Sequence, residues 1–199
     1  MRHALDADHV IAVTAIVSRE RSLVRAARVG VWWGVGHSAT IFTVGGAIIA
    51  LRLTVAPRVG LAFEFGVALM LITLGALNIW RAQDDVPSVA STMPPLVIGI
   101  VHGLAGSAAI ALVVLATIRD PVQGAVYLLV FGAGTIVGMM AVTSAIAASA
   151  LAATRRVPAM RRYVRLGAGA LSLVFGLTLA REIGVERQLF GATPVWSPK

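Results

Sequence analysis

The sequence contains no cysteine, and it has few charged residues. Without cysteine there is no disulfide framework and no thiolate metal site, so a metal would need histidine, carboxylate, hydroxyl or backbone oxygen ligands. Only 13% of the 199 residues are charged, whereas an ordinary soluble domain has about 25%. So little charge cannot cover a soluble protein with a water-compatible surface. We therefore expect no soluble domain.

Apolar sequence takes the place of charge, with 58% hydrophobic residues and a mean hydropathy of +0.86. A helix that spans a membrane needs roughly 20 apolar residues. The sequence predicts an all-α polytopic membrane protein, with residues 1–199 as a single transmembrane domain of about six transmembrane helices. The expected spans are 3–17, 29–51, 59–80, 95–118, 122–153 and 164–180, and the fifth is long enough to be tilted or broken.

The net charge of +8 comes largely from arginines between the apolar runs. In this context we interpret it as control of membrane topology and attraction to anionic lipid headgroups. The expected partner is the lipid bilayer and not nucleic acid. The Arg-rich loops 18–28 and 155–165 are predicted to be cytoplasmic, in a plasma (inner) membrane protein. Trp32 and Trp33, near the end of a span, are expected to be interfacial aromatics.

The two halves of the sequence align with each other, which predicts an internal repeat. Residues 3–8 match 102–107, residues 36–40 match 132–136, and Gly66 and Gly75 match Gly167 and Gly176. Because each half holds three spans, an odd number, the copies must have opposite orientations, as in many transporters. The predicted plan is two inverted three-helix repeats: repeat one about 1–81, a linker about 82–94, repeat two about 95–181, and a tail 182–199.

The alignment also bears on the first helix. Residues 94–101 supply further helical turns before His102, whereas only two residues precede His3. The first helix is therefore expected to be N-terminally truncated, with the natural protein starting upstream. If Met1 is the natural start, its amine, two residues before His3, offers a chelating group for nickel or copper.

Ionisable residues gather in segment 3–9, which holds two histidines and two aspartates and runs directly into an apolar stretch. On a helix, His3, Asp6 and His9 share one face, and Asp8 lies on the other side. Ionisable groups inside a membrane are costly and mark functional sites, and imidazole and carboxylate suit nickel, cobalt and zinc. The candidate metal ligands are His3, Asp6, Asp8, His9, His37 and His102, with Ser38, Ser107 and Thr135 as supporting residues.

Structural interpretations of these polar residues, without a role in metal binding, stay open. The first segment could be solvated at a frayed terminus, and a lone membrane histidine commonly forms an interhelical hydrogen bond. Glu64 is expected to be an interfacial carboxylate that faces Arg58, and Asn78 to bond across helices.

Two motifs carry a resemblance to a known family. Residues 2–9 resemble the His-x4-Asp-His signature of the nickel/cobalt permease (NiCoT) family, and Gly36-His37-Ser38 resembles that family's second motif. Residues 97–109 are most similar to the UreH-like branch, membrane proteins often named as urease accessory or nickel-transport proteins. The resemblance implies transition-metal transport, with His3, Asp8, His9 and His37 as signature residues. The acidic motif of the founding permeases is absent here, as is the histidine-rich loop of many relatives.

The expected function is transport of a divalent metal cation, Ni²⁺ (or Co²⁺), as substrate, without a permanently bound cofactor and without enzymatic activity. One alternative is efflux, or transport of another ion in the same fold. A second is a non-transporting membrane accessory factor for urease or hydrogenase metallation. An intramembrane metalloenzyme is a third, but no His-Glu-x-x-His helix is present. The direction of transport, its energy coupling and self-association as a homo-oligomer stay open.

Overall fold

The computed structural model describes residues 7–18, 20, 22–51, 55–81, 94–105, 118, 120–156 and 160–196. All regular structure in these residues is helical, which confirms the all-α prediction. The α-helices are α1 (Ala7–Val17), α2 (Leu23–Thr40), α3 (Gly46–Ala50), α4 (Pro57–Trp80), α5 (Pro95–Leu104), α7 (Pro121–Arg156) and α8 (Met160–Arg181). A π-helical segment, η2 (Ile41–Gly45), joins α2 to α3, and a second, η5 (Glu182–Glu186), extends α8.

Prolines set where several of the helices begin. Pro57 and Pro95 each occupy the first turn of their helix, where the missing N–H costs nothing and the fixed φ angle suits the helix. The helix α7 begins at Pro121, and the Asp120 carboxylate accepts a hydrogen bond of 2.9 Å from the Val122 backbone N–H. That contact satisfies one of the free donors at the helix start.

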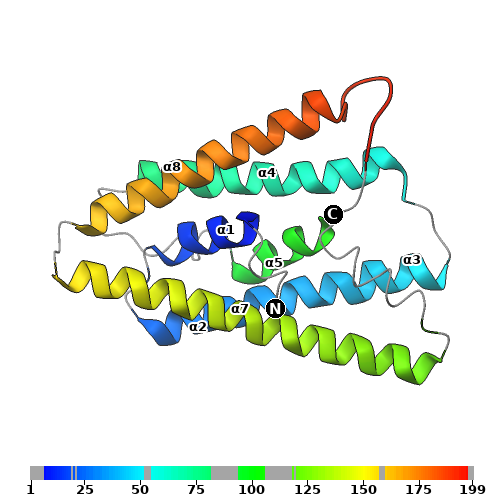
Figure 1. Ribbon diagram of the computed structural model, residues 1–199, viewed down its shortest axis with the longest axis horizontal. Coiled ribbons are helices and arrows are strands. Elements are labelled where there is room, and N and C mark those ends of the chain that lie inside the picture. Colours follow the sequence, from blue (N-terminus) through cyan, green and yellow to red (C-terminus); the bar gives the residue numbers. More distant parts are fainter. Residues whose placement is uncertain are drawn as a thin grey trace.

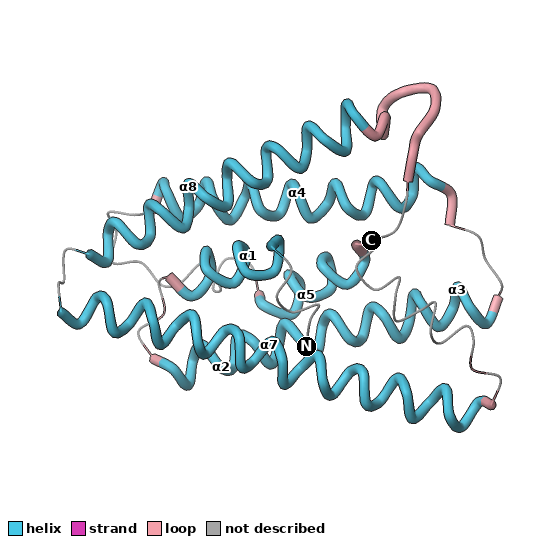
Figure 2. The backbone as a smooth tube through the Cα atoms, in the orientation of Figure 1, coloured by secondary structure: helices cyan, strands magenta, loops and turns pink. Residues whose placement is uncertain are grey.

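Two pairs of long helices flank two short ones (Figure 1). The helices α4 and α8 pack on each other along one side, and α2 packs against α7 on the other. Between the pairs lie α1, which contacts α4, α7 and α8, and α5, which contacts α2 and α4; the tube in Figure 2 shows both short helices enclosed by the long ones. The helix α1 is apolar on nearly all sides, so its burial in the middle of the protein is expected.

Small residues allow α4 and α8 to approach each other closely. A Cβ atom added at Gly75 would meet the Gly169 carbonyl oxygen at 2.7 Å, and one added at Gly176 would meet the Ala68 carbonyl oxygen at 3.0 Å. The Ser172 hydroxyl donates across the same interface to the Leu71 carbonyl at 2.8 Å. Backbone contacts of this kind are typical of helix packing in membranes.

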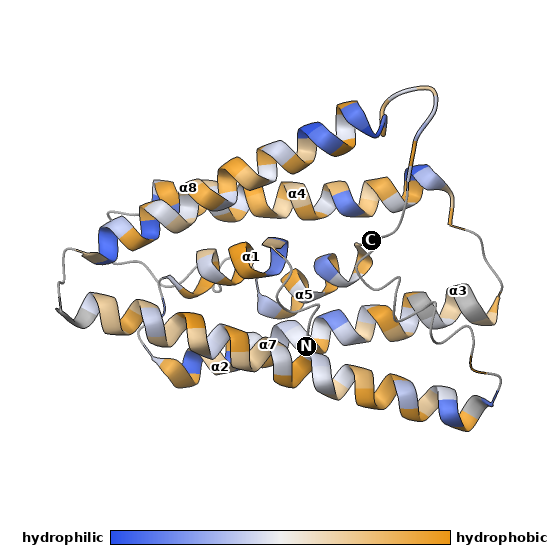
Figure 3. Cartoon of the chain, viewed as in Figure 1, coloured by the Kyte–Doolittle hydropathy of each residue, from blue (hydrophilic) through white to orange (hydrophobic). Residues whose placement is uncertain are grey.

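Three helical segments are long and apolar enough to cross a membrane: Pro57–Trp80, Val122–Thr154 and Met160–Glu186. Large apolar side chains also point outward, for example Val122, Leu129 and Val130 on α7, each about two-thirds exposed. Figure 3 shows hydrophilic residues at the two ends of α8, away from its apolar middle. The chain is thus an all-helical membrane protein. The six-span count stays a prediction, because α1 and α5 are shorter than a span in the described residues.

Several predicted boundaries need correction. Of the two alternatives for the fifth span, tilted or broken, the break is not seen, because α7 is one continuous helix of 36 residues, about 54 Å long. The two Arg-rich loops are shorter than predicted, since residues 23–28 already belong to α2 and residues 160–165 to α8. Arg165, expected in a loop, is buried on α8. Helix ends extend past the apolar runs because arginine is itself a good helix former.

The C-terminal segment folds back onto the start of α4. The Glu64 carboxylate accepts a hydrogen bond from Arg187 at 3.1 Å and another from the Trp196 indole N–H at 2.9 Å. The predicted pairing of Glu64 with Arg58 is therefore wrong, and Arg58 donates instead to the Gly191 carbonyl. The prediction for Asn78 is confirmed, because its amide donates to the Ala15 carbonyl of α1.

Candidate metal site

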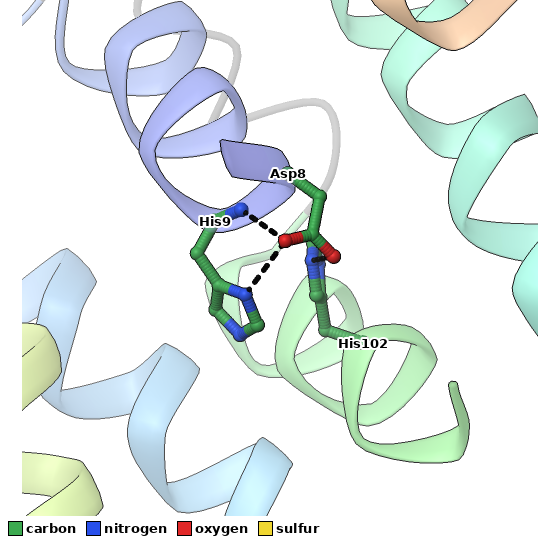
Figure 4. A group of neighbouring side chains, drawn as sticks. All are labelled: Asp8, His9 and His102. Carbon is green, nitrogen blue, oxygen red and sulfur yellow. Dashed lines mark hydrogen bonds and ion pairs between the residues drawn. The ribbon is translucent and has the colours of Figure 1, made fainter. Parts of the chain in front are cut away.

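The candidate site is formed by two short helices that are far apart in the sequence. Asp8 and His9 lie in the first turn of α1, and His102 lies in the last turn of α5. The Asp8 carboxylate sits between the two imidazoles (Figure 4). Its Oδ1 lies 3.2 Å from His9 Nδ1, and its Oδ2 lies 3.3 Å from His102 Nε2. The His9 backbone N–H also donates to Asp8 Oδ1, at 2.9 Å.

This group is buried inside an apolar protein. The His9 and His102 side chains are fully buried, whereas the Asp8 side chain keeps 26% exposure. A buried carboxylate is costly unless hydrogen-bond donors or a cation compensate for its lost hydration. The two imidazoles compensate for part of that cost, and the exposed part of Asp8 leaves one side of the group accessible.

Two further rings surround His9. The indole of Trp33 is stacked nearly parallel to the His9 ring, with centroids 6.0 Å apart, and it lies 5.4 Å from the His102 ring. The His37 ring meets His9 edge-on, with centroids 5.6 Å apart. Since Trp33 and His37 are four residues apart on α2, they share one helix face. His9 is thereby enclosed by rings from α2 and α5.

Glycines bring α2 and α5 together at this level. A Cβ atom at Gly99 would collide with the Trp33 carbonyl, and one at Gly36 would collide with the Leu96 carbonyl. One at Gly103 would lie 2.8 Å from the His37 carbonyl oxygen. The two backbones are therefore in direct contact, and this contact sets the distance between the residues of α2 and His102.

The residues fit a divalent cation. The ligand atoms of Asp8, His9 and His102 all lie within 4.8 Å of one another. Donors about 2.1 Å from one ion lie roughly 3 to 4 Å apart, so small side-chain movements would allow all three to bind it. The buried Nδ1 of His102 has no hydrogen-bond partner in the described part of the chain. Imidazole and carboxylate are ligands for nickel, cobalt and zinc, but ligand type alone does not choose among them.

The other predicted residues differ in their relation to this group. His37 adjoins it but is not one of the three clustered ligands. The Ser38 hydroxyl donates to the Gly132 carbonyl of α7 at 3.4 Å. The Thr135 hydroxyl donates to the Phe131 carbonyl within its own helix, at 2.9 Å. His3, Asp6 and Ser107 lie outside the described residues.

Two features of the site differ from the sequence analysis. The helical wheel separates Asp8 from His9, but at the first turn of α1 the carboxylate bends toward the His9 backbone and ring. Trp33 was expected to be interfacial, yet it is fully buried beside the imidazoles, whereas its neighbour Trp32 is exposed. The four-residue spacing between Trp33 and His37 is the signal that could have identified it.

Long apolar helices around a buried aspartate–histidine group define the class of this protein: an all-helical membrane protein with a candidate cation site among its helices. The chain belongs to the family of the urease accessory protein UreH. It is 32% identical to UreH of Bacillus sp. (strain TB-90) over 96% of this chain and 90% of that protein. This relationship confirms the resemblance to the UreH-like branch.

A more distant similarity links the chain to a plant protein. The protein is named chloroplast protein FOR GROWTH AND FERTILITY 2, from Arabidopsis thaliana, and is 24% identical over 95% of this chain and 54% of its own length. No protein-family model matches the chain. No solved structure matches it either.

Proposed function

We propose that this protein moves a divalent transition-metal cation, Ni²⁺ (or Co²⁺), across the plasma membrane. The observation that carries the proposal is the convergence of Asp8, His9 and His102 into one buried group of ligand atoms, from helices about 90 residues apart. The nickel/cobalt permease signature and the urease accessory name of the Bacillus relative both favour nickel. A link to urease or hydrogenase maturation is part of the same proposal.

The chemistry of these ligands suits transport better than permanent storage. A carboxylate and neutral imidazoles replace part of the hydration shell of a cation, and a small ligand set still allows the cation to leave. Asp8 supplies the negative charge that offsets the positive charge of the ion in an apolar surrounding. His37 lies next to His9 and offers a further imidazole along the path.

We further propose that the two halves form an inverted repeat, between which access to the site alternates. The contacts between α4 and α8 support this plan. Gly75 faces Gly169 and Leu173, and Gly176 faces Ala68 and Ile72. Each residue of α8 in these contacts lies 101 positions after its counterpart on α4. The contact that Gly75 makes with α8 is therefore repeated by Gly176 with α4, as a two-fold relation between the two helices requires. The dense arginine ends of α2 and α8 would then face the cytoplasm.

The test is accumulation of radioactive nickel in cells that lack their own nickel uptake. Cells with the protein should accumulate nickel above empty cells. The variant His102→Ala should return to the level of empty cells at equal abundance in the membrane. Ser149→Ala is the matched control, because this exposed hydroxyl bonds only within α7 in the described residues, and it should behave as the unaltered protein.

Other outcomes separate the remaining candidates. Accumulation below that of empty cells would assign efflux. A non-transporting accessory factor, which the name of the Bacillus relative also fits, would leave nickel content unchanged in every variant and still affect urease metallation. Unchanged accumulation in His102→Ala would reject the proposed path.

A further inference from the structure

The proposed transport function assigns no role to Trp33. It is fully buried, whereas Trp32, the preceding residue, is 55% exposed. Its indole lies against both imidazoles of the candidate site, at centroid distances of 6.0 Å from His9 and 5.4 Å from His102. No other tryptophan in the described residues has a ring contact with either histidine.

The two imidazoles are therefore restrained in two different ways. The Asp8 carboxylate holds one nitrogen of each ring, at 3.2 and 3.3 Å. Trp33 packs on the rings themselves, nearly parallel to His9 (10°) and tilted to His102 (50°). A hydrogen bond to one nitrogen fixes a distance but leaves the ring free to turn about it. A large aromatic neighbour restricts that rotation.

The position of the indole is itself well defined. A Cβ atom at Gly99 would collide with the Trp33 carbonyl oxygen, so α2 and α5 are in backbone contact at Trp33. Trp33 thus connects three helices, with its backbone against α5 and its ring against His9 of α1 and His102 of α5. A side chain held in this way can impose a ring orientation on its neighbours.

Ring orientation matters for the choice of metal. Zn²⁺ takes a tetrahedral arrangement of ligands, whereas Ni²⁺ with nitrogen and oxygen ligands favours square-planar or tetragonal arrangements. Imidazole is a ligand that suits both cations, so the choice between them depends on geometry. Outer groups that orient metal-binding histidines change affinity by about 10 to 100-fold when they are removed.

We propose that Trp33 is a positioning residue that sets metal selectivity, by fixing the planes of His9 and His102 so that the site prefers Ni²⁺ over Zn²⁺. This inference rests on the proposed function, since it needs the site to bind a cation. It adds a residue outside the ligand set and assigns to it the choice between cations.

The experiment compares Trp33→Leu, Trp33→Phe and Trp32→Leu in purified protein in lipid nanodiscs. The equilibrium affinity is measured for Ni²⁺ alone and for Zn²⁺ alone. Trp33→Leu should reduce the ratio of Ni²⁺ to Zn²⁺ affinity by at least about 10-fold. Trp33→Phe retains an aromatic ring and should restore most of the ratio. Trp32→Leu, a change of the same type on an exposed neighbour, should leave it unchanged.

A purely structural role would weaken the binding of both cations by the same factor, and that result would overturn the proposal. An unchanged ratio in Trp33→Leu would also overturn it. If Trp33→Leu does not yield folded protein, Trp33→Met, which is flexible and has no ring, carries the same test. Failure of the proposed cation site looks different: His102→Ala would then bind both cations as well as the unaltered protein, whatever Trp33 does. Failure of transport alone would appear as nickel accumulation equal to that of empty cells, with binding of Ni²⁺ retained.

Discussion

At the scale of single residues, Asp8 is central to the candidate site because it is the one carboxylate among the three clustered candidate ligands. It contacts both imidazoles and lies in the first turn of α1, where the helix dipole favours negative charge. In an apolar protein, a divalent cation gains more from this charge than from either neutral ring. The strength of binding should therefore depend most on Asp8.

The variant Asp8→Asn tests this point, because it keeps the size of the side chain and removes its charge. We expect the affinity for Ni²⁺ to fall at least about 10-fold. The matched control is Asp120→Asn, which retains an acceptor for the Val122 N–H at the start of α7 and should bind Ni²⁺ normally. Equal affinities in the two variants, measured by isothermal titration calorimetry, would show that the charge of Asp8 does not contribute.

Residue types and spacing were enough to predict Asp8, His9 and His102 as candidates, since ionisable residues in apolar helices are conspicuous. For Trp33 the four-residue spacing to His37 was the available signal, but it competed with the equal expectation that an aromatic residue near a span end lies at the membrane interface. The prediction of the partner of Glu64 failed for another reason. Arg187 and Trp196 reach it from more than 120 residues away, and no local pattern encodes that contact.

At the scale of helices, the contact between α2 and α5 determines the site. Gly36 on α2 and Gly99 on α5 leave no room for a Cβ atom, because each faces a carbonyl of the other helix. The helix α2 also carries Trp33 and His37, and α5 carries His102, whose rings lie at the candidate site. A small increase in the distance between the helices would therefore separate the imidazoles.

Gly99→Ala should force α2 and α5 apart, at a cost of about 1 to 3 kcal/mol typical of overpacking. Nickel accumulation should fall well below that of the unaltered protein, even where the variant is present in the membrane. Gly134→Ala is the control, because a Cβ atom at that position has no neighbour within 4 Å. Retention of full activity in Gly99→Ala would mean that the close contact is not needed for the site.

Apolar runs predicted the existence of the described helices well. The runs could not predict the ends, since arginines continue α2 and α8 beyond the apolar sequence and α7 extends unbroken over 36 residues. Hydropathy measures preference for the membrane, whereas a helix continues as long as its backbone hydrogen bonds do.

At the scale of the whole molecule, the short helices α1 and α5 lie between two pairs of long ones, and together they carry the three clustered candidate ligands. The internal alignment predicts that these two helices are equivalent members of inverted repeats. The reciprocal contacts of Gly75 and Gly176 support that prediction. The alignment could not predict the contact between Asp8 and His102, because it compares the halves with each other and gives no packing between them.

The proposed site requires that His9 and His102 bind the same cation. Nickel K-edge X-ray absorption spectroscopy of the protein in lipid nanodiscs tests this most directly, because scattering from imidazole rings is distinctive. We predict a nitrogen and oxygen shell with at least two imidazole rings, and one ring fewer in each of His9→Ala and His102→Ala. A spectrum without imidazole scattering, or one that neither variant changes, would contradict the account.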